Sequence, residues 1–154
     1  MATKHLEYFV NPEGVGAPLG AYSHAVTMRG GAATFVAGQV AVDIDGNLQG
    51  EGDLGRQTEV VFENLGRVLS AAGSSLGDVV KFTTFLTRAE DIPLFYETRA
   101  RLFDTYFPEH VYPANTLLVV QRLVRPEFLI EIEATAVVDV PQVQASGSGG
   151  RGRQ

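Results

Sequence analysis

Two helical segments that enclose a short β-rich segment place the strongest constraint on the fold of this chain. In residues 53–72, apolar side chains recur at the spacing of one helix face, and Asp53 is the predicted N-cap. Residues 81–87 (Lys-Phe-Thr-Thr-Phe-Leu-Thr) are rich in strand-forming residues. A second helix is predicted to begin with Asp91 as its cap and to end before Pro108. This alternation predicts a sheet packed against two helices.

Further short strands are predicted on both sides of this central part. They cover residues 5–10, 24–28, 34–40, 116–123 and 129–138. The predicted order is therefore β-β-β-α-β-α-β-β. This is an α+β fold in which one mixed sheet carries both helices on one face. The other face of the sheet stays apolar, and we expect self-association into a closed cyclic oligomer to cover it.

Composition limits the domain organisation and the classes of partner. With 154 residues, 45% hydrophobic and 19% charged, the chain suits one domain, predicted over residues 1–140 and followed by a Gly- and Ser-rich flexible tail over residues 141–154. A net charge of -6 argues against a general attraction to nucleic acid, and the absence of cysteine excludes disulfides and thiolate catalysis. No apolar run reaches the roughly 20 residues of a membrane span, and no signal peptide is visible, so a cytoplasmic location is expected.

Most standard enzyme motifs are missing: the chain has no metal-ligand cluster, phosphate loop or Gly-x-Ser-x-Gly elbow. Six segments nevertheless match the motifs of one known family in their order and spacing. They are residues 20–25 (Gly-Ala-Tyr-Ser-His-Ala), 36–40 (Val-Ala-Gly-Gln-Val), 63–65, 71–81, 112–116 (Tyr-Pro-Ala-Asn-Thr) and 131–137 (Glu-Ile-Glu-Ala-Thr-Ala-Val). Together they make the chain resemble the Rid/YjgF superfamily of reactive intermediate deaminases, also described as L-PSP endoribonucleases.

This resemblance implies a chorismate mutase-like fold and a homotrimer whose sheets form a central barrel, with one pocket in each cleft between subunits. It also implies hydrolysis of an enamine or imine to a ketone and ammonia, with neither cofactor nor metal. A small-molecule substrate and further copies of the chain are then the expected partners, with no role for nucleic acid or a membrane.

The expected catalytic residues are Glu131 and Tyr22. Glu131 matches the family residue that orients or activates the attacking water, and a carboxyl with a raised pKa suits this task; its alternative role is a structural hydrogen bond in the strand. Tyr22 matches the tyrosine that lines the pocket, and its alternative role is to anchor a loop. Glu133 alternates to the same sheet face as Glu131, and His24 occupies a position where the family accepts Gln or His. We interpret both Glu133 and His24 as structural.

The expected substrate-binding positions combine matches with departures from the family. Gly38 lets substrate and water approach the backbone, or marks a β-bulge, and Gln39 lines the pocket or braces its strand. Asn115 stands where the family usually has an arginine that grips the substrate carboxylate, so a contact of about 2–5 kcal/mol is lost; its alternative role is to cap the strand. Ala37 replaces a serine, and Tyr96 occupies a position where deaminase members commonly carry asparagine.

No other arginine is an obvious substitute. Arg122 matches a position that usually holds arginine in the family, and Arg99 and Arg101 of the second helix are expected to be solvated. The first functional hypothesis is thus an enzyme acting on a neutral or bulky imine, enamine or related conjugated intermediate, or a pathway-specific isomerase, cyclase or hydrolase that uses the same pocket. The others are a non-catalytic metabolite-binding module and a ribonuclease. The ribonuclease hypothesis has little support, because the chain is acidic and its tail offers only two arginines, Arg151 and Arg153.

Overall fold

The structure is a computed structural model that describes residues 5–140. Its strands are β1 (His5–Phe9), β2 (Ala25–Arg29), β3 (Ala32–Gln39), β4 (Val79–Leu86), β5 (Ala114–Val119) and β6 (Ile130–Val138). The two α-helices are α1 (Leu54–Ala71) and α2 (Ile92–Tyr106). The predicted order of strands and helices is confirmed. The predicted tail, residues 141–154, lies outside the described residues.

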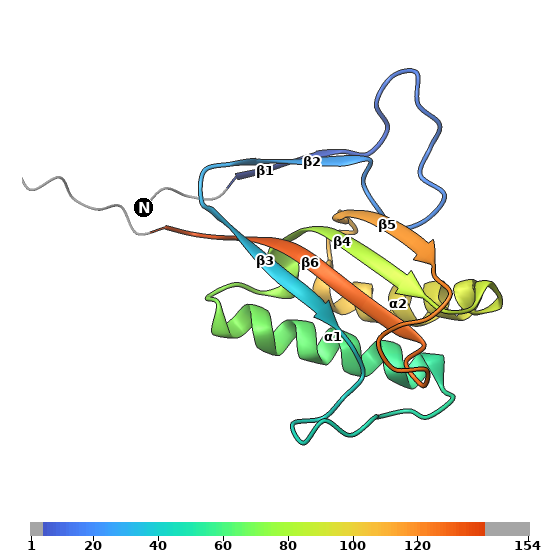
Figure 1. Cartoon of the computed structure of the whole chain (residues 1–154). Helices are drawn as coiled ribbons and strands as arrows, with labels where there is room; N and C mark the ends of the chain where they lie inside the picture. Colours follow the sequence, from blue (N-terminus) through green and yellow to red (C-terminus); the bar gives the residue numbers. More distant parts are fainter. Residues whose placement is uncertain (1–4, 141–154) are drawn as a thin grey trace, which may run out of the picture.

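The main sheet has four strands in the order β3-β6-β4-β5. β4 and β5 are parallel, whereas β6 runs antiparallel to both β3 and β4, so the sheet is mixed as predicted. β1 and β2 form a separate antiparallel pair, which Figure 1 shows beyond the β5 edge, and this differs from the single sheet predicted. A single parallel bridge between Ser23 and Ala114 links the chain just before β2 to β5.

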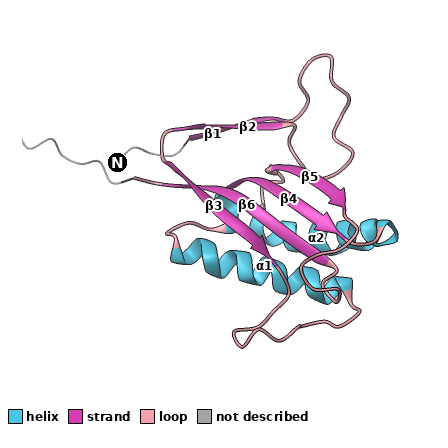
Figure 2. Cartoon of the chain, viewed as in Figure 1, coloured by secondary structure: helices cyan, strands magenta, loops and turns pink. Residues whose placement is uncertain are grey.

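Both helices cover the same face of the main sheet (Figure 2), as predicted. The core between them is aromatic: the Phe62 ring of α1 lies 5.6 Å from Phe82 of β4 and 5.9 Å from Phe103 of α2. Burying each such side chain contributes about 1.5–3 kcal/mol. Val68 shares the helical spacing of the apolar residues of α1, yet it is 39% exposed.

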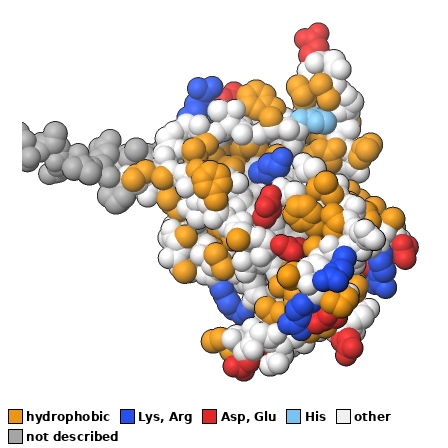
Figure 3. All heavy atoms as spheres, in the orientation of Figure 1, with side chains coloured by type: hydrophobic (Ala, Val, Ile, Leu, Met, Phe, Trp, Pro, Cys, Tyr) orange, Lys and Arg blue, Asp and Glu red, His pale blue; other side chains and the backbone are white. Residues whose placement is uncertain are grey.

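The opposite face of the main sheet carries exposed apolar side chains. Phe35 of β3 is 81% exposed, and Figure 3 shows hydrophobic side chains interspersed with charged ones over this side. Within residues 5–140, neither helix is long and apolar enough to cross a membrane.

The N-terminal ends of the two helices test the predicted capping residues. Asp53 caps α1, because its Oδ1 accepts a hydrogen bond from the Arg56 backbone N–H at 3.0 Å. Asp91 occupies the N-cap position of α2, as predicted, but its side chain makes no capping hydrogen bond. Its backbone already belongs to a short 3₁₀ turn, and its Oδ2 accepts a hydrogen bond from Nε of Arg88 at 2.7 Å.

The end of β5 also differs from the prediction. The strand was expected to run over residues 116–123, but it covers Ala114–Val119. β5 hydrogen-bonds to β4 alone among the named strands, and the last pair in this register is Leu86 with Val119. Beyond Val119 no β4 residue remains to pair with, so the apolar sequence that follows leaves the sheet.

Candidate functional site

The closest approach among the predicted site residues joins Gly38 of β3 to Glu131 of β6. A Cβ atom added at Gly38 would lie 1.9 Å from Oε1 of Glu131 and 2.7 Å from its Cδ. Between Val36 and Gln39 the register against β6 shifts, so Gly38 sits in a β-bulge. The predicted bulge is therefore confirmed, and the neighbour that approaches the backbone at this glycine is the Glu131 side chain. The bulge brings the β3 backbone against the carboxylate, and only glycine leaves room for it.

The Glu131 carboxyl lies on the sheet face away from the helices. Glu131 is paired with Phe85 of β4, whereas the alternate β4 residues Thr84 and Leu86 are buried beneath the helices. Burial raises the pKa of the Glu131 carboxyl, and the negative charge of Glu133 raises it further. This arrangement makes Glu131 a better proton acceptor than an ordinary glutamate, as general base catalysis requires.

A shallow hollow of about 310 Å³ opens beside Glu131. It is lined by Glu131 together with Phe85, Val120, Arg122, Leu123 and Val124. The Arg122 guanidinium donates hydrogen bonds to the carbonyls of Leu123 (3.1 Å) and Val124 (3.3 Å), so it stabilises the loop after β5. Sequence reasoning did not place Arg122 beside Glu131.

Ala37 and Gln39 flank the glycine. Ala37 is exposed, and the Gln39 side chain donates a hydrogen bond to the Ala37 carbonyl at 3.1 Å. In the single chain this contact favours the bracing role for Gln39. We refer to Ala37, Gly38, Gln39 and Glu131 as the Glu131 group.

Asn115 of β5 faces the other way. Its Oδ1 accepts a hydrogen bond at 3.1 Å from Oγ1 of Thr84, which is 1% exposed on the helix-covered side. Asn115 is also paired in register with Phe82, a core residue. The Asn115 and Glu131 side chains therefore lie on opposite faces of the same sheet.

Tyr22 belongs to a loop tied to the start of β5. The Ser23 backbone donates a hydrogen bond to the Pro113 carbonyl at 3.1 Å, and the Ser23 hydroxyl donates one to Tyr112 O at 2.6 Å. The Tyr22 hydroxyl accepts a hydrogen bond from the Leu19 backbone N–H at 3.2 Å, a contact that fits the loop-anchor role. His24 similarly contacts Gly16 O at 2.8 Å, in agreement with its structural interpretation.

Tyr96 of α2 packs under the same loop. A Cβ added at Gly20 would lie 3.7 Å from Cε1 of Tyr96. The loop is bridged at Ser23 to Ala114, the neighbour of Asn115, and it lies against Tyr96 at Gly20. Tyr22 therefore lies in the same region as Tyr96 and Asn115. We refer to Tyr22, Tyr96 and Asn115 as the Asn115 group.

Arg99 of α2 contradicts the expectation that helix arginines are solvated. It is only 2% exposed, and its guanidinium carbon lies 4.9–5.2 Å from the centroids of three aromatic rings, those of Phe95, Tyr96 and Phe103. A signal for this burial was present, because Arg99 lies four residues from both Phe95 and Phe103 on the apolar helix face. Arg101 is exposed, as expected, and its Nη2 forms an ion pair with Oε1 of Glu59 at 3.6 Å.

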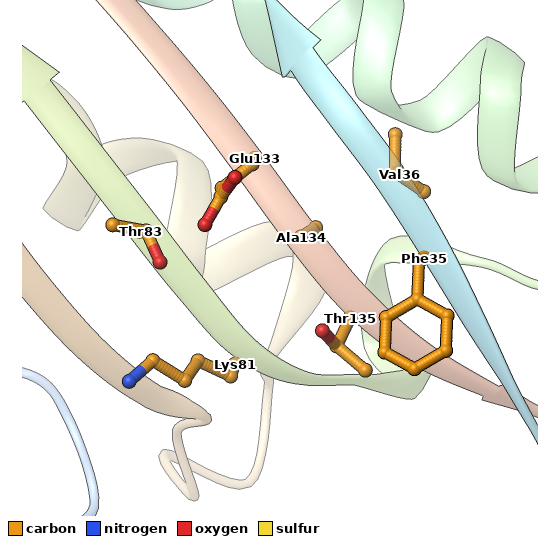
Figure 4. Close-up of a pocket in the computed structure, with 7 residues that line it drawn as sticks. All are labelled: Phe35, Val36, Lys81, Thr83, Glu133, Ala134 and Thr135. Atoms are coloured by element: carbon orange, nitrogen blue, oxygen red, sulfur yellow. The ribbon is translucent and has the colours of Figure 1, made fainter.

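A further cavity of about 320 Å³ lies on the open face of the sheet (Figure 4). Its lining includes Phe35, Lys81, Thr83 and Glu133 but no predicted catalytic or substrate-binding residue. Within residues 5–140, no cluster of three or more His, Asp or Glu side chains could hold a metal ion.

Comparison with known proteins identifies the family. The model of the family described as Endoribonuclease L-PSP matches residues 15–138, which include both groups of site residues. The chain belongs to this family. The Rid/YjgF resemblance predicted from the motifs is thereby confirmed, and the α+β fold agrees with it.

Relatives within the L-PSP family include proteins described as deaminases. A RutC family protein of Pyrococcus horikoshii is 40% identical over 119 residues, which cover 77% of this chain and 88% of that protein. A 2-iminobutanoate/2-iminopropanoate deaminase of Salmonella typhimurium is 32% identical over 127 residues, covering 81% and 93%.

A solved structure of the family shares the fold as well. The crystal structure of a Rid family protein of unknown function from Yersinia pestis is 36% identical, with a TM-score of 0.73, and the match covers 88% of this chain and 98% of that one.

Proposed function

We propose that this chain is a Rid-type enzyme that hydrolyses a reactive imine or enamine to a ketone and ammonia, without a cofactor. The observation that carries the proposal is the Glu131 carboxyl, which has a raised pKa and lies against the bulge glycine Gly38. The relatives described as 2-iminobutanoate/2-iminopropanoate deaminases support the same reaction class.

In this mechanism Glu131 accepts a proton from a water molecule as the water oxygen attacks the imine carbon. Glu131 passes this proton to the imine nitrogen, which gives a tetrahedral adduct with a hydroxyl and an amino group. The hydroxyl proton then moves to the amino group, again through Glu131, and the C–N bond breaks to release ammonia and leave the ketone. Gly38 leaves space for water and substrate beside the carboxylate, because no side chain projects from the β3 backbone at this point. General base catalysis of this kind contributes typically 10²–10⁴-fold to the rate.

The substrate we propose is neutral or bulky rather than a simple 2-imino acid. Asn115 brings no charge to the position where family members usually have arginine, and its carbonyl oxygen is engaged by Thr84. Its amide N–H groups remain available to a neutral acceptor, but they cannot replace a bidentate charged contact. Tyr96, which packs beneath Gly20, adds aromatic surface to the same region.

The proposed pocket requires more than one copy of the chain. Because Glu131 and Asn115 face opposite sides of the sheet, a site that uses both must combine the Glu131 group of one copy with the Asn115 group of another. A homotrimer with a central barrel supplies such clefts and also covers the exposed Phe35 face.

We therefore expect light scattering at micromolar concentration to give three times the mass of the chain. Phe35→Lys, which places a charge in the proposed barrel, should weaken this association and lower activity in parallel. As a control, Leu19→Lys changes a loop residue that is 94% exposed and should leave the mass unchanged. A monomeric wild-type protein with full activity would contradict the intersubunit site.

Asn115→Arg tests the assigned reaction and its specificity. An amino-acid oxidase supplies a 2-imino acid, a neutral imine is offered in parallel, and ammonia release is measured. We expect wild type to act poorly on the small imino acid and Asn115→Arg to gain at least about tenfold in kcat/KM on it, since a charged contact is restored. If both proteins are inactive on every imine, a pathway-specific isomerase or cyclase, or a metabolite-binding module, replaces the deaminase hypothesis.

A further inference from the structure

Within residues 5–140, two nitrogen atoms of the buried arginine of α2, Arg99, find no hydrogen-bond acceptor. Nε and Nη1 of Arg99 are fully enclosed and lack a hydrogen-bond partner, and among residues 5–140 no carboxylate forms an ion pair with this side chain. Three aromatic rings lie against its guanidinium, those of Phe95, Tyr96 and Phe103. Rings can attract a cation, but they do not accept its in-plane hydrogen bonds.

A buried guanidinium without a hydrogen-bond acceptor lowers the stability of the fold, which is unfavourable for a residue with a purely structural role. An isolated buried charge loses several kcal/mol of hydration, and buried charged groups are normally paired for this reason. An apolar side chain of similar length would fit the Phe95–Phe103 face of α2 without this penalty. Because nearly all buried polar groups in native proteins are hydrogen-bonded, unpaired buried donors call for an explanation, and a functional role is one of those known.

The position of Arg99 connects it to the Asn115 group. A Cβ added at Gly20 would lie 3.6 Å from Nη2 of Arg99 and 3.7 Å from Tyr96, so the guanidinium and Tyr96 share the space beneath the Gly20 loop. The same loop is bridged through Ser23 to Ala114, next to Asn115. Nη2 faces Gly20, where no side chain projects between the guanidinium and the loop backbone.

We propose that Arg99 binds a carboxylate of the substrate, and so supplies from α2 the positive charge that Asn115 does not supply from β5. The inference rests on the proposed function. Of the two substrate classes proposed there, neutral or bulky, it selects the bulky one and adds that this substrate carries a carboxylate. The planar guanidinium fork matches the two oxygens of a carboxylate, and the surrounding rings suit an unsaturated or aromatic substituent. Tyr96 and the Gly20 loop separate to admit this substrate.

Binding of a charged and a neutral probe tests Arg99 without requiring turnover. Calorimetry compares 3-phenylpyruvate, a ketone that carries a carboxylate, with its neutral methyl ester. Wild type should bind the acid about 30-fold more tightly than the ester, as expected for a desolvated charged contact. Arg99→Met should remove this preference, and Arg99→Lys should keep part of it. Arg101→Met, which changes an exposed arginine two residues away, should keep all of it.

Thermal unfolding separates a binding role from a structural one. If Arg99 serves a ligand, Arg99→Met removes an unpaired buried charge and should keep or raise the Tm by a few degrees. Equal binding of acid and ester by wild type, an acid preference that survives Arg99→Met, or a folded Arg99→Lys without any preference would overturn the inference. A preserved acid preference in a protein that releases no ammonia would refute the deaminase proposal and leave the Arg99 assignment standing.

Discussion

Glu131→Gln should lower kcat for imine hydrolysis by about 10²–10⁴-fold while leaving the protein folded. The substitution keeps the shape of the side chain against Gly38 but removes its ability to accept a proton from water. The free energy of unfolding should change little. Burial and the negative charge of Glu133 both disfavour the ionised form of Glu131, so the charge that glutamine removes does not stabilise the fold. Ammonia release under saturating substrate measures kcat, and thermal unfolding checks the fold.

The pH profile gives this prediction a second readout. The base must be ionised, so the rate should fall as pH drops through the pKa of Glu131, and this acid limb should lie above the ordinary glutamate value of 4.5. Glu133→Gln is the matched control: it should retain activity and move the acid limb to lower pH, because it removes the charge that helps raise the pKa. An unchanged rate in Glu131→Gln would show that another group activates the water.

Gly38→Ala should reduce activity by at least about 10²-fold with only a small effect on stability. The new Cβ would lie 1.9 Å from Oε1 of Glu131, so the carboxylate must swing away, and displacing a catalytic group by about 1 Å costs on this scale. The atoms displaced are the end of a flexible side chain. Moreover, replacing glycine by alanine in a strand restricts the unfolded chain, which offsets part of the crowding.

Gly16→Ala provides the control for this glycine. Nothing lies within 4 Å of a Cβ at Gly16, and its φ is not in the left-handed region, so activity should not change and Tm should stay the same or rise slightly. Steady-state kinetics and thermal unfolding of the two variants, side by side, separate the loss of space at Gly38 from a general effect of alanine. If Gly38→Ala is fully active, the close approach to Glu131 plays no part in the reaction.

Much of the site was predictable because short motifs carry local geometry. A glycine within a β-rich segment indicates a bulge or a close backbone approach, and Gly38 shows both. Strand alternation places Glu131 and Glu133 on one face, and the charge of Glu133 does raise the pKa of Glu131. Asp53 caps α1 because the acceptor and the donor that it satisfies lie only three residues apart.

Features that depend on distant residues were less accessible from the sequence. Asp91 is a good cap by type, but its carboxylate accepts a hydrogen bond from Arg88 and makes no capping hydrogen bond to α2. β5 ends at Val119 because its pairing partner ends, although the apolar sequence continues. Its charge predicts that Arg99 lies in solvent, but Arg99 is buried because it lies between Phe95 and Phe103 on the apolar face of α2.

By itself, the sequence determined the family and the order of strands and helices, because periodicity, caps and motifs act over a few neighbouring residues. Only the tertiary structure showed that Glu131 and Asn115 face opposite sides of one sheet and that Arg99 is enclosed without an acceptor. These facts follow from the register between strands and from the packing of α2 under the Gly20 loop. Both join residues far apart along the chain, and no local pattern specifies them.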